Sequence, residues 1–333
     1  MVFKSFVGID VSKLTLDVCV ASAEDVHQGS HREFKNTQKG FEQLLKFVIK
    51  QGSELSSTLF CFENTGDYSL LLSHFLKEKG CGFHMANPMT ISRSKGLLRA
   101  KTDKIDSKVL MEYAYKQRDF IELSELATAP LLQLRNLHTT RKRLVKEKTA
   151  QQQQIKLLEQ TAEVIDNQFL LDLLEEKLEF LILQIKAVEK KIDQVIDEHP
   201  EIKKNVELIR SIPGVGPVLA VSLIITTKNF TSFTCGRKYA SYCGVAPFPH
   251  SSGTSVRGRT KSSKICNREV KALLTNCVTS LINHDAGVKA YYKRKLEEGK
   301  KHFIVVNNIR AKLINRVFAV VKRDQNYVAL NFA

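Results

Sequence analysis

Four acidic residues in the first third of the chain have positions that suit phosphoryl chemistry. Asp10 ends a short apolar segment, and Glu63 ends a second one. Asp103 and Asp106 are three residues apart in a segment of helical spacing, which puts both on one face of the expected helix. Two-metal phosphoryl chemistry needs several carboxylates that converge on Mg²⁺ ions about 3.5–4 Å apart, one ion for the attacking oxygen and one for the leaving oxygen. Strand ends beside a helix face can supply them.

Each of these acids also has a simpler explanation when it is taken alone. An aspartate at the end of a strand can cap a turn, Asp103 can cap its own helix, and Asp106 can be a solvated neighbour. The four together, in a strongly basic chain, favour a metal site over these explanations. Basic residues around the helical pair suit phosphate binding, namely Arg99, Lys101 and Lys104.

The charge of the chain is positive and unevenly distributed. The 333 residues include 51 Lys and Arg against 35 Asp and Glu, a formal net charge of +16. Residues 251–333 hold 17 of the basic residues and only 5 of the acidic ones. A solubilising surface is one explanation, but segregation this strong favours a polyanionic partner such as a nucleic acid.

Residues 1–125 alternate between short apolar segments and segments of helical spacing, which predicts an α/β domain. Strands are expected at 6–10, 14–20, 31–34, 58–62 and 83–85, and helices at 41–49, 68–79 and 103–115. The first two strands should form a hairpin, and alternating strands and helices should follow. This order predicts a mixed sheet with helices on it.

Residues 126–200 have the spacing of coiled-coil helices. Apolar residues recur at steps of three and four from Leu171 to Val195, whereas the earlier run from Leu134 to Leu158 has polar residues at several of these positions. A break at 161–168 allows either an antiparallel hairpin within the chain or a coiled coil between chains. The strict period of the second run favours a role in dimerisation.

Residues 201–333 are expected to form a basic, mainly α-helical domain. The segment 209–217 (IRSIPGVGP) has the helix-hairpin-helix pattern, in which Gly214 and Gly216 would let backbone N–H groups approach a phosphate. A packing turn between two helices explains the same glycines equally well. The segment 250–259 is rich in Gly, Ser and Arg and is predicted to be a flexible loop.

Several protein classes are not indicated by the sequence. None of the seven cysteines forms a CxxC pair, which argues against a zinc knuckle or a disulfide framework. The first residues, MVFKSFVGIDVSK, have no long apolar core, and no apolar run approaches the ~18 residues of a membrane span. We therefore expect a cytoplasmic protein without a membrane partner.

An ordered set of short motifs resembles one family of mobile-element proteins. The motifs are GIDVSK at 8–13, FENTG at 62–66, NP at 87–88, KTDKID at 101–106, IPGVG at 212–216, GVAP at 244–247, SG at 252–253 and SVRG at 255–258. They resemble the DEDD, RuvC-like transposases of the insertion-sequence-110 family, which are guided by a bridge RNA, and the Piv-type DNA invertases. The resemblance spans nearly the whole chain in the same order. Asn64 departs from it, since a small residue is expected there.

The resemblance implies an RNase-H-like (RuvC-like) fold for the N-terminal domain and an active site made of two parts. Asp10, Glu63, Asp103 and Asp106 would bind Mg²⁺, and Ser252 would attack DNA and form a covalent phosphoserine, with the serine supplied across a dimer. Spacing alone does not separate Ser252 from Ser251 or Ser255. The basic residues that follow would hold the scissile phosphate and its neighbours, namely Arg257, Arg259, Lys261 and Lys264. The implied partners are donor and target DNA, a structured non-coding bridge RNA, and further copies of the chain as a dimer or tetramer.

Three other functions explain parts of the sequence. A RuvC-like junction resolvase would need the four acids but not Ser252. A sugar-kinase or actin-like ATPase would suit the GIDVSK hairpin, but a second glycine-rich phosphate loop is missing and the basic tail would have no role. A non-catalytic nucleic-acid-binding remnant of a mobile element would not need the intact set of acids.

Overall fold

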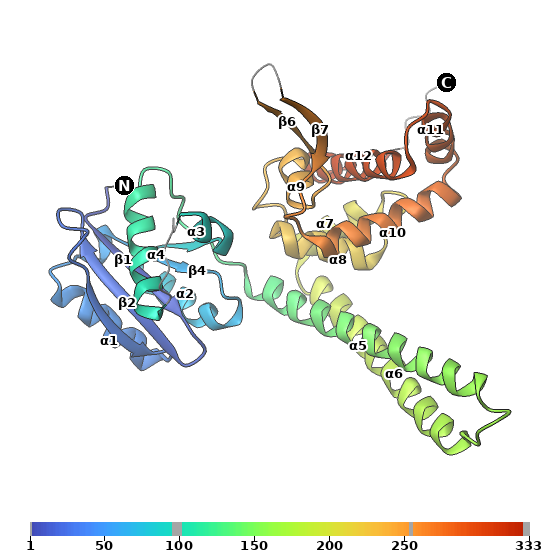
Figure 1. Ribbon diagram of the computed structural model, residues 1–333, viewed down its shortest axis with the longest axis horizontal. Helices are drawn as coiled ribbons and strands as arrows, with labels where there is room; N and C mark the ends of the chain where they lie inside the picture. Colours follow the sequence, from blue (N-terminus) through green and yellow to red (C-terminus); the bar gives the residue numbers. More distant parts are fainter. Residues whose placement is uncertain (1, 95–101, 253–255, 329–333) are drawn as a thin grey trace. The chain divides into compact units, whose positions relative to one another are not determined.

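The computed structural model describes residues 2–94, 102–252 and 256–328. The chain divides into two compact units, Met1–Leu126 and Ala127–Ala333. In Figure 1 the first unit runs from blue to teal, and the second runs from green to red. Each unit has its own hydrophobic core, so each is described by itself.

The N-terminal unit is built on a five-stranded mixed sheet with the strand order β3-β2-β1-β4-β5. The pairs β1–β2 and β2–β3 are antiparallel, whereas β1–β4 and β4–β5 are parallel. The strands are β1 (Ser5–Val11), β2 (Thr15–Ser22), β3 (Ser30–Lys35), β4 (Thr58–Glu63) and β5 (Gly82–Ala86). The expected hairpin, the strand–helix alternation after it and the mixed sheet are all present.

Helices cover both faces of this sheet. They are α1 (Gln38–Lys50), α2 (Asp67–Glu78), α3 (Pro88–Ser94) and α4 (Asp103–Gln117), with a short 3₁₀ turn, η1 (Leu55–Ser57). Side chains of a strand alternate between the two faces, so Val7 and Ile9 pack with α1 and α2, while Phe6 packs with α4. Helix α3 was not expected from the sequence, because its seven residues are too few to show a helical period.

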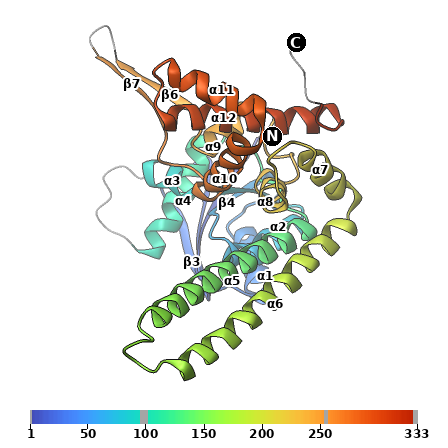
Figure 2. The ribbon, with the colours of Figure 1, turned by 90° about the vertical axis from the view of Figure 1, so that its right-hand side faces the viewer.

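The C-terminal unit begins with a long helical hairpin. Helices α5 (Ala129–Gln160) and α6 (Gln168–Asp197) lie side by side in both views of Figures 1 and 2. Of the two arrangements that the sequence allowed, the antiparallel hairpin within the chain is therefore the one observed for the runs Leu134–Leu158 and Leu171–Val195. The seam includes buried Ile155 and Ile185, and Arg141 Nε donates a hydrogen bond of 2.7 Å to Glu189 Oε1 across it.

The base of the hairpin joins a single core with the remaining helices. Leu134 and Val195, both fully buried, belong to the same cluster as residues of the later helices. These helices are α7 (Pro200–Arg210), α8 (Pro217–Thr227), α9 (Gly236–Tyr242), α10 (Arg268–His284), α11 (Ala286–Glu297) and α12 (His302–Arg323). In the parts of the chain that the structure describes, no helix has both the length and the apolar character needed to cross a bilayer.

A two-stranded antiparallel hairpin corrects one expectation for the C-terminal region. Strands β6 (Pro247–Ser252) and β7 (Val256–Ser262) occupy the segment that was predicted to be a flexible loop in an otherwise helical domain. Figure 1 shows this hairpin extending away from the helices of its unit. Backbone pairing holds the two strands, and a sequence rich in Gly, Ser and Arg does not reveal such pairing because its apolar residues do not alternate.

Candidate functional site

Asp10 lies near the end of β1, on the sheet face that α4 covers. In the antiparallel pair it is directly opposite Asp17 of β2. In the parallel pair Ile9 is aligned with Phe62 of β4, so the next residue, Glu63, comes beside Asp10 on the same face. Strand register therefore brings together residues that are far apart in sequence at one end of the sheet.

Helix α4 approaches β1 closely at Gly8, which lies two residues before Asp10 on the same face. A Cβ atom on Gly8 would lie 2.1 Å from the Ser107 carbonyl oxygen and 2.2 Å from the Met111 amide nitrogen. Only glycine permits this approach of backbone to backbone. The close packing brings the first turn of α4, with its two acids, toward the strand ends.

The N-terminus of α4 explains how Asp103 and Asp106 are presented. The cap is Thr102, whose Oγ1 accepts a hydrogen bond of 3.3 Å from the Ile105 amide. Asp103 is therefore not the residue that caps this helix. Both acids are in the first turn, where negative charge is stabilised by the helix dipole. Asp103 is exposed and Asp106 is half-buried.

The electrostatics of Asp10 show that the four acids share one neighbourhood. The pKa of Asp10 is raised to about 6 by burial, the largest cause, together with the negative charges of Asp106, Asp103, Glu63 and Asp17, in that order. Like charges raise the pKa of a carboxyl group only at short range. The acids predicted from separate segments of the sequence therefore act on one another in the folded chain.

The donor set suits a hard divalent cation, although its geometry is open. Mg²⁺ prefers carboxylate oxygens, and a cation would relieve the repulsion that raises the pKa of Asp10. Within the described ranges, no group of three or more His, Cys, Asp or Glu side chains is placed closely enough to hold a metal ion. The carboxylates thus lie near one another without forming a closed cage.

Asp17 and His31 belong to this neighbourhood and were missed in the sequence. Asp17 is only 8% exposed, and its Oδ1 is 2.8 Å from His31 Nε2 of β3. The hairpin of β1 and β2 was expected, but its register was not. Counting outward from the turn between the two strands places Asp17 opposite Asp10, and this count is the signal that would have found it.

The basic residues predicted around the acids are described only in part. Lys104 is exposed on the first turn of α4. Arg99 and Lys101 lie outside the described residues. A role of these side chains in phosphate binding stays a prediction.

Ser252 is the last residue of β6, at the far end of the β6–β7 hairpin. It pairs with Val256 of β7, and the preceding Ser251 pairs with Arg257. Gly253 and Ser255 lie outside the described residues, as do the side chains from 249 to 260, including those of Ser252, Arg257 and Arg259. The backbone thus places the predicted nucleophile at the tip of a two-stranded ribbon, beside the strand with the predicted phosphate ligands.

Two further predicted phosphate ligands stand at the other end of β7. Lys261 is exposed and pairs with Phe248, and Lys264 is exposed just after the strand. The hairpin therefore has basic residues along β7 and directly after it. Their contact with a phosphate stays a prediction.

The glycine turn between α7 and α8 is engaged in packing. Gly214 has φ +81°, and a Cβ there would lie 2.6 Å from Leu281 Cγ on α10. The Val215 amide donates to the Ile212 carbonyl at 3.1 Å. These contacts are those of a packing turn, so phosphate binding by Gly214 and Gly216 stays a prediction without further support.

Comparisons with known proteins cover both units. A family model for the DEDD transposase of IS110, described as a transposase, matches residues 7–162, and a second, described as transposase IS116/IS110/IS902 family, matches residues 206–293. The pilin gene-inverting protein of Moraxella bovis is 25% identical over 332 residues, which covers 97% of this chain and 98% of that protein. The insertion element IS110 uncharacterized 43.6 kDa protein of Streptomyces coelicolor is 31% identical over 144 residues, which covers 43% of this chain and 34% of that protein.

Proposed function

Because the chain belongs to the IS110 family of transposases, we propose that this DNA transposase exchanges strands by Mg²⁺-assisted serine transesterification, with its target selected by a bridge RNA. The observation that carries the proposal is that Asp106, Asp103 and Glu63 lie close enough to Asp10 to raise its pKa. That effect supports a metal site made from separate segments, as phosphoryl transfer requires. The strand order, with β1 at the centre of a mixed sheet, supports an RNase-H-like fold.

The carboxylates would hold the divalent ion. Asp10 and Glu63, on adjacent parallel strands, and the two acids on α4 are the ligands we propose. When bound, Mg²⁺ stabilises negative charge on the phosphate oxygens. Asp17 is paired with His31, so we assign it to the support of the site rather than to the ligand set.

Ser252 would supply the nucleophile. Its Oγ attacks the phosphorus, a serine–phosphate ester forms, the P–O bond to one deoxyribose oxygen breaks, and that oxygen takes up a proton. A second strand's hydroxyl then attacks the phosphoserine, which releases Ser252 and rejoins DNA. The number of phosphodiester bonds is conserved, so ATP is not required. Placement at the tip of the β6–β7 hairpin supports this role, because the hairpin extends away from the helices of its unit and the serine can then reach a phosphate that lies outside that unit.

Rejoining, and not cleavage alone, is supported by the comparisons. A gene-inverting protein must cut and rejoin DNA, and the similarity to such a protein covers 97% of this chain. A junction resolvase that uses only carboxylates would explain residues 7–162 but not the similarity over the C-terminal unit.

A second copy of the chain is the partner we propose for helix α6. Beside its buried seam, α6 has a second stripe of exposed apolar residues, Phe169, Leu173, Phe180 and Leu183. Steps of four, seven and three place them on one helical face. Exposed aromatic and aliphatic side chains in a row mark an interaction surface. Pairing of two such stripes would join two chains through a surface separate from the α5–α6 seam.

The test is strand exchange by the purified protein with Mg²⁺ and the RNA transcribed from the sequence that flanks its gene. Ser252→Ala and Asp10→Ala should each abolish recombination, and the covalent protein–DNA adduct should disappear with Ser252→Ala. Ser251→Ala is the matched control and should keep both. Full cleavage by Ser252→Ala together with inactive Asp10→Ala would instead identify a nuclease that uses only carboxylates.

A further inference from the structure

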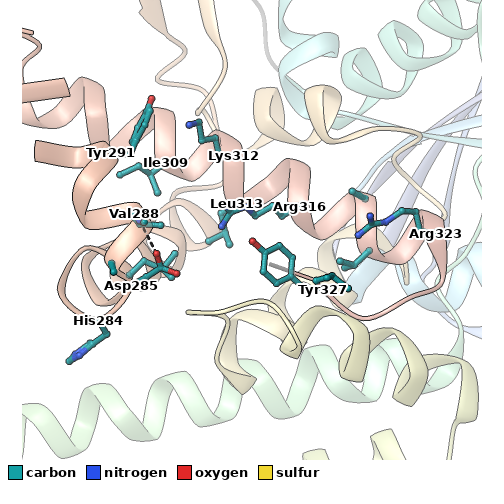
Figure 3. A pocket seen from close by; sticks show the side chains of 16 residues that line it. His284, Asp285, Val288, Tyr291, Ile309, Lys312, Leu313, Arg316, Arg323 and Tyr327 are labelled. Carbon is teal, nitrogen blue, oxygen red and sulfur yellow. Dashed lines mark hydrogen bonds between the residues drawn. The ribbon is translucent and has the colours of Figure 1, made fainter. Parts of the chain in front are cut away.

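A groove lies between α10, α11 and α12 in the C-terminal unit. No residue of the β6–β7 hairpin lines it. Its volume is about 760 Å³. Its floor contains buried apolar side chains of α12, among them Ile309 and Leu313. Figure 3 shows polar and aromatic side chains standing around this floor. None of the residues assigned to the catalytic site lines it.

Basic side chains follow one face of α12 along the groove. Lys312, Arg316 and Arg323 are spaced by four and seven residues, which places them on the same side of the helix, and all three line the groove. Within the described residues, none of the three forms an ion pair with a carboxylate. Three like charges in a row repel one another, so the arrangement favours an anionic ligand.

The one carboxylate in the lining is already engaged. Asp285 is the N-cap of α11, and its Oδ1 accepts a hydrogen bond of 2.7 Å from the Val288 amide. The nearby Asp324 is paired with Lys204 of α7 at 2.5 Å. The groove therefore keeps an excess of positive charge.

Two tyrosines form walls of the groove, and each faces a cation. Lys312 Nζ is 3.6 Å from the centroid of the Tyr291 ring, and the Arg316 guanidinium is 5.3 Å from the Tyr327 ring centroid. Both tyrosines are half-buried, so part of each residue remains accessible. Tyr327 is fixed in place, because its backbone amide donates a hydrogen bond of 2.8 Å to Ser211 Oγ.

From this combination we propose that the groove binds an unpaired stretch of nucleic acid, with bases against Tyr291 and Tyr327 and phosphates on Lys312, Arg316 and Arg323. An unpaired strand offers both a flat base and a phosphate, whereas a duplex keeps its bases stacked inside. Aromatic rings beside cations in a groove match the base and phosphate of an unpaired strand. The inference rests on the proposed function only in taking nucleic acid as the partner.

The experiment measures binding of the full-length protein to labelled oligonucleotides of roughly 12 nucleotides by fluorescence anisotropy in EDTA, where no strand exchange takes place. The probes are oligouridylate, oligothymidylate and a DNA duplex. One variant removes charge (Lys312→Gln with Arg316→Gln), and a second removes stacking (Tyr291→Ala with Tyr327→Ala). The matched control is Lys289→Gln with Lys293→Gln, which removes the same charge from α11 outside the groove.

We expect both groove variants to bind the single strand at least about tenfold more weakly, with duplex binding changed by less than about twofold. The charge variant should also lower the slope of log Kd against log salt by about 0.7 for each lost phosphate contact. If only the binding of oligouridylate is weakened, the ligand is unpaired RNA. If the binding of oligouridylate and oligothymidylate is weakened alike, the groove accepts any unpaired strand.

The proposal is wrong if the groove variants behave like the control pair, or if single-strand and duplex binding fall together. Matched thermal midpoints exclude loss of the fold as the cause. The result does not depend on serine or carboxylate chemistry, because the anisotropy measurement in EDTA detects binding in the absence of strand exchange. A recombination-competent Ser252→Ala protein would overturn the proposed mechanism and leave this groove unaffected.

Discussion

The carboxylate site and the β6–β7 hairpin present their predicted residues in opposite ways. Asp10, Glu63 and the acids of α4 come from three distant segments, and strand register and a close helix approach gather them. The predicted residues of the hairpin, from Ser252 to Lys264, are already neighbours in sequence, so the fold has nothing to gather. Convergence of distant residues is itself support for a site. Residues that are adjacent in sequence give no such support, so a role for them has to be tested by substitution and activity.

The largest effect is expected from Gly8→Ala. The new Cβ would meet backbone atoms of α4 at 2.1 and 2.2 Å, which cannot move without shifting the helix. We expect a loss of more than about 3 kcal/mol in the free energy of unfolding, measured in urea, and complete loss of strand exchange. The control is Gly287→Ala in the C-terminal unit, where the Cβ would meet only Asp285 Oδ1 at 3.4 Å. It should be neutral or gain up to about 0.5 kcal/mol. Equal losses in both variants would contradict the close-approach argument.

A second large effect is expected where lysines replace the exposed stripe of α6. Phe180→Lys with Leu183→Lys should raise the Kd for self-association by at least about 100-fold, since two apolar side chains leave the interface. Light scattering over a concentration series measures it. Glu175→Gln with Glu179→Gln makes the same change in net charge outside the stripe and should leave association intact. An unchanged oligomer in the lysine variant would remove the stripe from the interface.

Asp10→Asn should stabilise the protein at neutral pH in EDTA. The folded-state pKa of Asp10, about 6, lies above the ordinary 3.8, so the folded chain keeps a proton that the unfolded chain has lost. The contribution of Asp10 to stability therefore falls as the pH rises from about 4 to about 6 and stays low above that. Asparagine escapes this loss and should gain roughly 1 kcal/mol at pH 7, after allowance for solvent screening, and nothing at pH 4. Thermal unfolding across pH checks it.

Mg²⁺ should act on the same pair of proteins in the opposite direction, because it favours the wild type. Saturating Mg²⁺ should stabilise the wild type through binding to the folded state only, and should stabilise Asp10→Asn less. An asparagine variant that is less stable than the wild type in EDTA at pH 7 would contradict the account of Asp10.

The smallest effect is expected from Asp17→Asn, which should lower the pKa of Asp10 slightly. Asp17 contributes less to that pKa than Asp106 does, so Asp106→Asn should lower it more. Titration of the Asp10 carboxyl carbon by NMR resolves the order. Equal shifts from both substitutions would mean that the strand neighbour and the helix neighbour lie equally close in solution.

Much of the N-terminal unit could be predicted because its strands are short apolar runs bounded by turns. The end of β4 at Glu63, and the place of Asp10 one residue before the end of β1, could be read from such runs. The place of Asp17 was missed, because it follows from the count outward from the β1–β2 turn and not from a local pattern of apolar residues. The β6–β7 hairpin escaped prediction for a related reason, since strand pairing is made by backbone groups, and a pattern of side chains does not record it.

The long helices of the C-terminal unit were predictable from their period, but their partners were not. The seam from Leu171 to Val195 is observed against α5, within the chain. The same period is compatible with a partner in another chain, and loop length alone does not choose between them. The groove between α10, α11 and α12 could not be predicted either, because it brings Tyr291 of α11 together with Lys312 of α12 and with Tyr327, which follows α12.

The glycine at position 8 also bears on how copies of such a gene lose function. Mobile elements accumulate mutations once selection on them stops, and a survey of acidic motifs would score a copy with all four acids as intact. A single codon change from glycine to alanine would leave that motif untouched while it forces α4 off the sheet. Surveys that sort living elements from relics should therefore count this missing side chain as part of the catalytic signature.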